Sequence, residues 1–346
     1  MTKKKKIVLS VLGGVFAVML FAGWFIGRKV YDRKASNFGR SAELFVYPDA
    51  TWETITNYII DSCDVKWNAS LRRCIKEVSV SNSLKPGHYI VEAGQTSTAV
   101  ARMLSHGWQT PVKLVLSGTM RLQSGLAKKI SSQMMLDSAD VITGLRDSAL
   151  LAGLGFKKEN VFALIIPDTY EVLWTDDMAE ILSRQKKAYD AFWTAENKEK
   201  AEFQGLTQEE VSVLASIVKG ETNYEPEMPK IAGVYLNRLR KGMKLQADPT
   251  IAFCYDYTLN RILKKHLSVD SPFNTYKHAG LPPAPICVPT RACLEAVLNP
   301  DTAKGYLYFC ANSNFDGTHS FASSYSEHLR NARSFQRALT IRLRGK

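Results

Sequence analysis

The stretch TQEEVSVLASIVKGE, residues 207–221, decides how the second half of this chain folds. Thr207 and Glu210 form a capping box, in which the threonine hydroxyl accepts from a backbone amide of the first turn and the glutamate reaches back. Apolar residues then recur every three or four positions, which predicts an amphipathic helix packed on a core. Pro226 prevents the helix from running much further. The stretch therefore predicts a helix that ends close to Glu221.

Glu221 is expected at the margin of the apolar face of this helix, near its C-terminus. Partial desolvation and the negative end of the helix dipole both disfavour a charged carboxylate there, so its pKa should be raised. A carboxyl group that stays protonated near neutral pH can act as a general acid. The plainer interpretation is a half-buried glutamate held by Arg238 or Arg240, and helix placement alone favours it.

Length, composition and charge limit the classes of protein that this chain can belong to. Its 346 residues are 45% hydrophobic and 23% charged, which suits about two folded domains and excludes a disordered protein. The net charge is +12, but residues 1–34 hold eight basic residues and one acidic residue, which leaves +5 for the remainder. The other lysines are dispersed, so the charge pattern indicates a membrane surface and argues against nucleic-acid binding.

Residues 7–27 form an apolar run without a formal charge. At 1.5 Å per residue this run can cross a hydrocarbon core of about 30 Å. A cleaved signal peptide is the alternative, but its apolar region is usually about 7–15 residues long and ends in small residues. Here the run closes with Gly23-Trp24-Phe25-Ile26, so we expect an uncleaved anchor with the bulk of the chain outside the cytoplasm.

After a polar segment, short strand-like and helix-like pieces alternate up to about residue 130. Residues 45–47, 88–91 and 112–116 have the pattern of strands, with amphipathic helices starting near Thr51 and Thr96. Such an arrangement predicts a small LysM-like α/β module of the kind that binds extended polymers, although fold alone does not establish function. The expected fold class is thus α+β, with one N-terminal transmembrane helix, this module and a mixed α+β domain.

Neither the cysteines nor the common cofactor motifs indicate a specific function for this chain. The six cysteines are compatible with disulfides such as Cys63–Cys74 and Cys287–Cys293, and equally with buried free thiols. The sequence has no Cys-x-x-Cys or His-Glu-x-x-His motif, which argues against a zinc site, and no glycine-rich phosphate loop. We therefore expect no metal and no organic cofactor.

Seven segments from residue 214 onward match the motifs of one family in order and spacing. They are LASIVKGET (214–222), VYLNRL (234–239), MKLQADPT (243–250), SPFNTY (271–276), GLPPAPI (280–286), YLYF (306–309) and GTHSF (317–321). Weaker matches lie at 86–89, 118–122 and 167–170. On these motifs the chain resembles the endolytic murein transglycosylases, the MltG or YceG-like family, over most of residues 43–340.

The resemblance implies a lytic transglycosylase, a lyase of class EC 4.2.2.-. Such an enzyme cleaves the β-1,4 bond between N-acetylmuramic acid and N-acetylglucosamine in nascent peptidoglycan without water. Glu221 matches the family's catalytic glutamate, which would protonate the glycosidic oxygen and then act as base toward the muramyl 6-hydroxyl, closing a 1,6-anhydro ring. This scheme needs one carboxyl group and not the pair that most glycosidases use.

The resemblance also implies the location and partners of the chain. We expect a single-pass protein of the inner membrane with its catalytic domain on the periplasmic side. Its expected partners are peptidoglycan glycan strands, the inner membrane and peptidoglycan synthases, with no nucleic acid. The expected parts are a cytoplasmic tail (1–6), a transmembrane anchor (7–27), a tether (28–42), the LysM-like module (43–115), a connecting α/β region (116–205) and the transglycosylase catalytic domain (206–346).

Four further residues in the matched segments are candidates for substrate binding. Gln246, Asn274 and Tyr276 offer hydrogen bonds suited to acetamido and hydroxyl groups, and His319 follows a glycine loop. A structural hydrogen bond within the fold is an equally good interpretation of each. Asp248 precedes Pro249 and is better explained by turn chemistry than as a second acid.

The chain departs from the family pattern directly before the catalytic position. Lys219-Gly220 stands where the family usually has an acidic residue and then a basic or acidic one. Gly220 loosens the helix, and Lys219 places a positive charge two positions from Glu221. Side chains at that spacing point in different directions. The departure leaves the extent of the Glu221 pKa shift open.

Two other functions fit parts of the sequence. The first is a catalytically silent peptidoglycan-binding scaffold of the cell-wall synthesis machinery, which would have no need of a carboxyl group at position 221. The second is a thiol enzyme that uses Cys310 with His319. Cys310 follows an apolar strand, which favours a position in the core.

Overall fold

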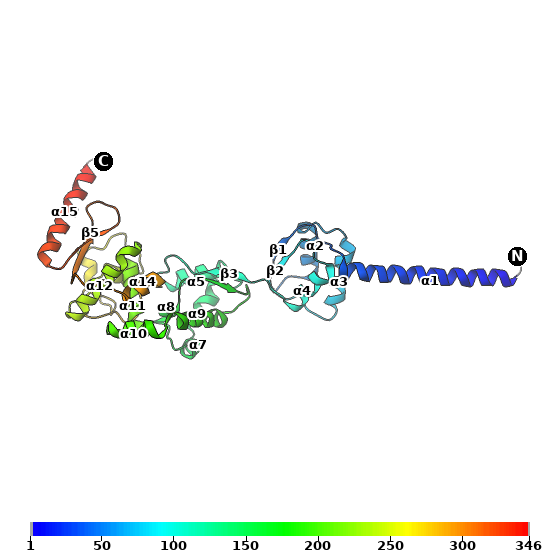
Figure 1. Ribbon diagram of the computed structural model, residues 1–346, viewed down its shortest axis with the longest axis horizontal. Coiled ribbons are helices and arrows are strands. Elements are labelled where there is room, and N and C mark those ends of the chain that lie inside the picture. The colour runs from blue at the N-terminus through cyan, green and yellow to red at the C-terminus, as the bar shows by residue number, and fades with distance from the viewer. Residues whose placement is uncertain (1–2, 345–346) are drawn as a thin grey trace. The chain divides into compact units, whose positions relative to one another are not determined.

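The computed structural model describes residues 3–344 and has a mixed α+β fold (Figure 1). The chain divides into two compact units. Unit 1 comprises Met1–Lys113 and Glu171–Thr175, and unit 2 comprises Leu114–Tyr170 and Asp176–Lys346. Within the described residues the strands form three sheets of two strands each. The predicted α+β class and the N-terminal apolar helix are thereby confirmed.

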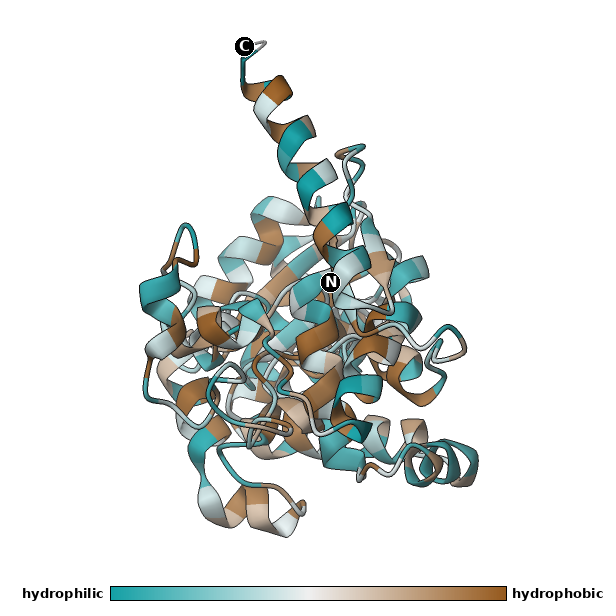
Figure 2. Ribbon diagram, turned by 90° about the vertical axis from the view of Figure 1, so that its left-hand side faces the viewer, coloured by the Kyte–Doolittle hydropathy of each residue, from teal (hydrophilic) through white to brown (hydrophobic). Residues whose placement is uncertain are grey.

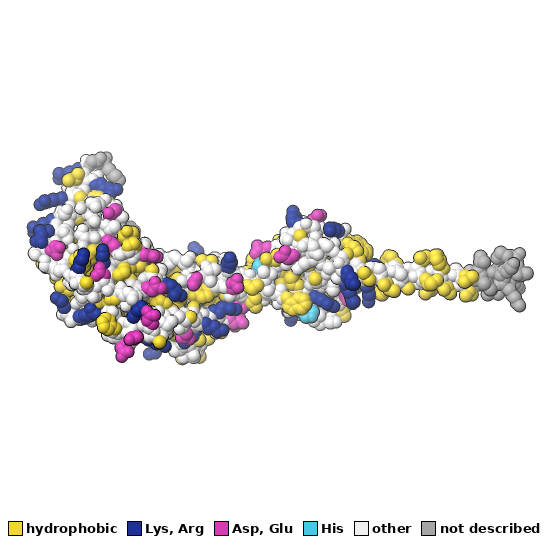
Figure 3. All heavy atoms as spheres, viewed as in Figure 1, with side chains coloured by type: hydrophobic (Ala, Val, Ile, Leu, Met, Phe, Trp, Pro, Cys, Tyr) yellow, Lys and Arg dark blue, Asp and Glu magenta, His cyan; other side chains and the backbone are white. Residues whose placement is uncertain are grey.

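The first helix of unit 1, α1 (Lys3–Lys34), is long and apolar enough over Ser10–Lys34 to cross a membrane. Its side chains from residue 10 to residue 27 are exposed, and Figure 3 shows hydrophobic side chains spread along this stretch. The helix continues through the first residues of the expected tether. There Asp32 is buried and its carboxylate accepts from Ser70 Oγ (2.5 Å) and from Arg73 Nη2 (2.7 Å). The end of α1 is therefore fixed to the remainder of unit 1.

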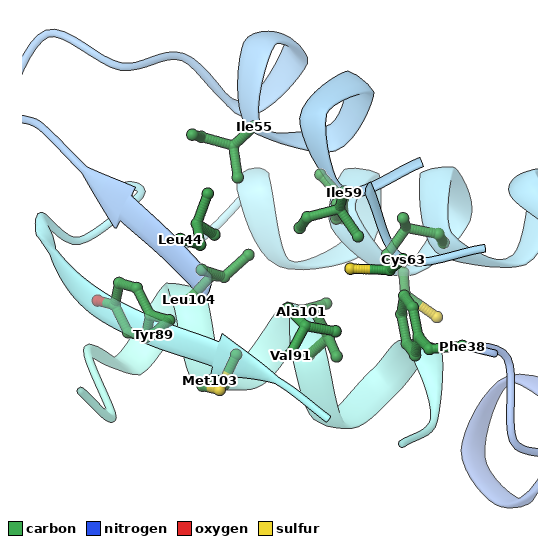
Figure 4. Packing of buried hydrophobic residues seen from close by; sticks show 14 of the residues in the cluster. Phe38, Leu44, Ile55, Ile59, Cys63, Tyr89, Val91, Ala101, Met103 and Leu104 are labelled. Atoms are coloured by element: carbon green, nitrogen blue, oxygen red, sulfur yellow. The ribbon is translucent and has the colours of Figure 1, made fainter. Parts of the chain in front are cut away.

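The body of unit 1 consists of two strands and three helices. In chain order they are β1 (Ala42–Val46), α2 (Trp52–Ser62), α3 (Asn68–Ser79), β2 (Gly87–Val91) and α4 (Ser97–His106). The strands β1 and β2 pair in an antiparallel register, with Leu44 opposite Tyr89. Buried side chains from the strands and helices, among them Ile59 and Leu104, fill the space between them (Figure 4). A strand–helix–helix–strand core with one further helix results.

The helices of unit 1 begin and end where local chemistry requires. Thr51 caps α2 by accepting from the Thr54 amide, and Thr96 caps α4 by accepting from the Ala99 amide. Gly107 ends α4 with φ of 71°, a left-handed conformation that glycine adopts without steric cost. The helix starts that the sequence predicts near Thr51 and Thr96 are therefore confirmed.

Unit 2 is predominantly helical. Its hairpin consists of β5 (Tyr308–Ala311) paired antiparallel with β6 (His319–Ala322). The strands β3 (Val112–Val115) and β4 (Thr169–Val172) also pair with each other, and the residues of both strands are divided between the two units. The helices are α5 (Gln123–Ser131), α6 (Ser138–Arg146), α7 (Ser148–Gly153), α8 (Val161–Leu164), α9 (Met178–Phe192), α10 (Ala195–Phe203), α11 (Gln208–Glu221), α12 (Met228–Arg240), α13 (Asp248–Cys254), α14 (Arg291–Leu298) and α15 (Tyr325–Arg344), with 3₁₀ turns η1 (Glu225–Glu227) and η2 (Lys264–Ser268).

Helix α11 forms where the opening sequence stretch predicts it, but it is buried on all sides and not on one apolar face only. Both hydrogen bonds of the capping box between Thr207 and Glu210 are present, and the helix ends at Glu221. Every residue from 211 to 218 is buried, in contact with α12, α13 and α14. The polar Ser216 is satisfied there because its hydroxyl accepts from the Ile286 amide at 3.0 Å. Burial on all sides makes α11 the element around which the rest of unit 2 packs.

Within unit 2, helix α15 packs against the β5–β6 hairpin. Tyr308 of β5 stacks on His328, with ring centroids 5.4 Å apart, and Phe315 of the hairpin loop contacts Phe335. The second half of α15 extends beyond the body of the unit, with hydrophilic and hydrophobic residues interspersed along it (Figure 2). Its first half therefore forms part of the wall of unit 2.

The six cysteines are all free, and four of them are buried. This arrangement agrees with the interpretation as buried thiols and not with the Cys63–Cys74 and Cys287–Cys293 disulfides. Burial raises the pKa of the Cys287 thiol to about 12 and also raises the pKa of Cys310. A nucleophilic thiol requires a lowered pKa, so the environment of Cys310 does not support a thiol enzyme.

Candidate active site

Glu221 lines a cavity of about 270 Å³ in unit 2. Four segments meet there: the end of α11, the middle of α12, the turn that leads into α13, and the loop that follows η2. Strand β5 and the first turn of α15 complete the wall. The residues that line the cavity are Glu221, Tyr235, Arg238, Gln246, Asp248, Tyr276, Phe309 and His328.

Two phenol hydroxyl groups hold the two carboxyl groups of this cavity. Tyr235 donates to Glu221 Oε1 at 2.5 Å, and Tyr276 donates to Asp248 Oδ1 at 2.5 Å. The Tyr235 side chain is itself buried, so this hydrogen bond restricts the position of the Glu221 carboxyl. Within residues 3–344, no hydrogen-bond donor contacts the second carboxyl oxygen of Glu221 or of Asp248.

Burial raises the pKa of Glu221 to about 7. The negative charge of Asp248 raises it further, whereas the Tyr235 hydrogen bond and the positive charge of Arg238 lower it. Part of the Glu221 population is therefore protonated at neutral pH. This is the protonation behaviour that a general acid needs.

Arg238 does not hold Glu221 as an ion-pair partner. Its Nε donates to the Leu307 carbonyl at 2.7 Å and its Nη1 to the Leu245 carbonyl at 2.6 Å. Arg240 donates to Gln204 at 2.8 Å. Over residues 3–344 no ion pair joins either arginine to Glu221, so the plainer interpretation of Glu221 as a glutamate held by arginine does not describe the structure.

The structure brings two of the four predicted substrate-binding residues to the cavity. Gln246 and Tyr276 line it together with Glu221. Gln246 has φ of 49°, a left-handed conformation that is uncommon for a residue with a side chain, and its amide donates to the Thr275 carbonyl at 3.1 Å. Such a conformation persists only where its surroundings enforce it, which occurs often at functional sites.

The other two predicted residues have structural partners. Asn274 is fully buried; its amide group donates to the carbonyls of Leu267 and Val269, and its Oδ1 accepts from the Tyr276 amide at 2.9 Å. It thereby holds the loop that carries Tyr276. His319 contacts the buried Glu227, with 2.9 Å between Nδ1 and Oε2, and is not among the residues that line the cavity.

The residues predicted to bind substrate leave out several side chains that line the cavity. Tyr235 and Arg238 lie on one face of α12 three positions apart, a spacing visible in the sequence. Asp248 was assigned to a turn, yet it begins α13 and also lines the cavity. Phe309 and His328 carry no such signal, because only the folding of β5 and α15 onto α12 brings them near Glu221.

The packing of α11 against α13 requires a glycine at position 220, which the sequence does not reveal. A Cβ atom at this position would lie 2.5 Å from Pro249 Cβ, closer than real contacts allow. The absence of a side chain therefore lets α11 and α13 approach each other directly beside the carboxyl groups. Gly220 thus permits close packing of the two segments that carry Glu221 and Asp248.

Among the residues that the structure describes, no group of three or more His, Cys, Asp or Glu side chains is arranged to hold a metal ion.

Comparisons with known proteins point to one family. The model of the YceG-like family matches residues 44–334. A protein of Bacillus subtilis strain 168 named endolytic murein transglycosylase is 29% identical over 269 residues, which is 72% of each chain. A protein of Streptococcus pneumoniae D39 with the same name is 28% identical over 177 residues, 48% of this chain and 31% of that protein.

A solved structure agrees with the sequence comparisons. The crystal structure of a putative yceG-like protein of Listeria monocytogenes superimposes with a TM-score of 0.56 at 26% identity. The match covers 84% of this chain and 98% of the Listeria chain.

The neighbours of Glu221 predict opposite effects of two substitutions on its pKa. Asp248→Asn removes a negative charge and should lower the pKa of Glu221 below about 7, whereas Tyr235→Phe removes a hydrogen bond to the carboxylate and should raise it. NMR titration of carboxyl-¹³C-labelled glutamate in both variants and in the parent protein measures the shifts. Shifts in the same direction, or none, would contradict this account of the site.

Proposed function

The chain belongs to the YceG-like family, and we propose that it is an endolytic murein transglycosylase. The reaction would cleave the MurNAc–GlcNAc β-1,4 bond of nascent peptidoglycan and leave 1,6-anhydroMurNAc ends. The relatives named endolytic murein transglycosylase support this activity at 29% and 28% identity. The observation that carries the proposal is the Glu221 carboxyl group, which lines a cavity and whose pKa is raised to about 7.

In this proposal Glu221 performs both proton transfers. The protonated carboxyl group donates to the glycosidic oxygen as the bond to the muramyl carbon breaks. The resulting carboxylate then takes the proton of the muramyl 6-hydroxyl, whose oxygen closes the anhydro ring. Because the pKa of Glu221 is about 7, donation and acceptance have similar driving force near neutral pH. Tyr235 would keep the carboxyl group oriented in both steps.

The remaining cavity residues would bind the sugar. Gln246 and Tyr276 line the cavity and carry amide and hydroxyl groups suited to the acetamido and hydroxyl groups of the substrate. We assign Asn274 a supporting role, since it holds the Tyr276 loop. His319 would position the β5–β6 hairpin through its contact with Glu227.

The competing function is a peptidoglycan-binding scaffold without activity. The raised pKa of Glu221 disfavours it, because a scaffold gains nothing from a carboxyl group that is costly to bury.

We further propose that the β1–α2–α3–β2 core of unit 1 is the LysM-like module. Glycan co-sedimentation tests this assignment, and unchanged binding by Tyr58→Ala, which removes an exposed aromatic ring, would count against it.

Replacement of Glu221 tests the reaction directly. Glu221→Gln should lower the formation of anhydroMurNAc ends from uncrosslinked glycan strands by at least about 100-fold, because proton transfer is lost. Mass spectrometry measures these ends, which are one water lighter than hydrolysed ends. The matched control is Glu202→Gln, an exposed glutamate of α10. Reducing ends from the parent protein would indicate a hydrolase, and no cleavage by a folded sample would favour the scaffold.

The pKa of Glu221 predicts the pH dependence of the reaction. The acid form is required for the first step, so kcat/KM should decrease about tenfold per pH unit above a pKa of about 7. Asp248→Asn should move this decrease to lower pH, because it lowers the pKa of Glu221. Initial rates between pH 5 and about 9 provide the measurement. An unchanged rate through this range would exclude Glu221 as the acid whose protonation limits the reaction.

The apolar helix α1 indicates where in the cell the chain is located. We propose that it anchors the chain in the inner membrane with the catalytic unit in the periplasm, since Ser10–Lys34 is apolar enough to span a membrane. The full-length chain should stay in the membrane after a carbonate wash and be degraded by protease added to spheroplasts. A mature chain that begins after residue 27 would instead indicate a cleaved signal peptide.

A further inference from the structure

Glu221 lines a second cavity in addition to the one described above. This second cavity has a volume of about 490 Å³ and lies beside the end of α11. Glu221 is the residue that its wall shares with the first cavity. Its other lining residues include Thr119, Arg121, Lys219, Asn223, Tyr224 and Asp316. The reactive carboxyl group is thus at the border of two separate spaces.

The wall of the second cavity carries two cations without an acidic partner. Lys219 Nζ donates to Asn223 Oδ1 at 2.6 Å, and the Arg121 guanidinium lies over the Tyr257 ring at 4.9 Å. No ion pair to either side chain occurs within residues 3–344. Asp316 also lines the cavity, but its Oδ1 accepts from the amide and hydroxyl of Thr318. An anion that enters this space would meet two positive charges that have no ion-pair partner, together with the one negative charge of Asp316.

The remaining lining groups are suited to a sugar. Tyr224 is 49% exposed and presents an aromatic ring on which the apolar face of a pyranose can pack. Thr119 and Asn223 add a hydroxyl and an amide group for hydrogen bonds to sugar hydroxyls. A cavity with an aromatic ring, short polar side chains and two cations has the chemistry of a site for an acidic saccharide.

We propose that the second cavity binds the glycan on the far side of the scissile bond and that Lys219 and Arg121 recognise a carboxylate of its peptide stem. The proposal rests on the proposed transglycosylase function and adds a substrate requirement to it. An enzyme that cuts within a strand must hold sugar units on both sides of the bond, and Glu221 lies between two cavities that supply these sites. Charge-assisted hydrogen bonds from Lys and Arg to carboxylates are among the stronger polar contacts.

The test is a binding measurement in the Glu221→Gln background, where the strands stay intact. Fluorescent uncrosslinked glycan strands are compared with the same strands after carbodiimide amidation of their carboxyl groups. The Glu221→Gln protein should bind the native strands about tenfold more tightly than the amidated ones, the effect of one or two charge-assisted contacts. Adding Lys219→Gln or Arg121→Gln should reduce this preference, and adding both should abolish it.

A matched control separates this site from general charge attraction. Lys187→Gln removes an exposed lysine of α9 that does not line either cavity, and it should leave the preference unchanged. Loss of preference in Lys187→Gln to the same extent as in Lys219→Gln would overturn the proposal. Equal binding of native and amidated strands by the Glu221→Gln protein would also overturn it.

Kinetics with an intact Glu221 distinguish this proposal from the proposed function. Lys219→Gln should raise KM for native strands with a smaller change in kcat, and should not affect amidated strands. If the parent protein forms no anhydro ends and the binding preference persists, the function is wrong and carboxylate recognition stands. If anhydro ends form at the same KM on both strands, the function stands and carboxylate recognition is wrong.

Discussion

The burial of the Glu221 carboxyl group is the constraint to which the rest of unit 2 is adapted. A carboxylate loses hydration when it is buried, and the protein compensates with one hydrogen bond from the buried Tyr235 instead of with an ion pair. The balance leaves a group that exchanges its proton near neutral pH. A bidentate arginine would have stabilised the carboxylate and lowered its pKa, and the site would then lack a proton donor.

Two further packing interactions hold the segments that surround this carboxyl group. Gly220 allows Pro249 to lie directly against α11, which brings the start of α13 and Asp248 to the cavity. Arg238 donates to the carbonyls of Leu245 and Leu307 and so joins the turn before α13 to the segment before β5. The guanidinium thus acts as a brace between backbone segments and contributes positive charge to the cavity at the same time. Arg238 therefore contributes both to the packing around the site and to its electrostatic potential.

Several elements were predictable from local sequence because local interactions create them. The capping box of Thr207, the apolar periodicity after it and the break at Pro226 together define α11 and the position of Glu221 at its end. The candidate residues of the cavity were less predictable. Gln246 and Tyr276 line it, whereas Asn274 supports a loop and His319 contacts Glu227. The sequence does not distinguish a polar motif residue that binds a ligand from one whose hydrogen bonds hold a loop in place.

The sequence by itself determined the apolar helix α1, the α+β class and the position of Glu221 at the end of α11, because each depends on composition, periodicity or adjacent residues, and its runs of motifs indicated the family. Only the tertiary structure decided that Tyr235 holds Glu221, that Arg238 holds backbone carbonyls, and that Glu221 borders two cavities. These features join residues from Thr119 to His328 that are distant along the chain. Their contacts depend on how helices and hairpins pack, and local sequence does not encode that packing.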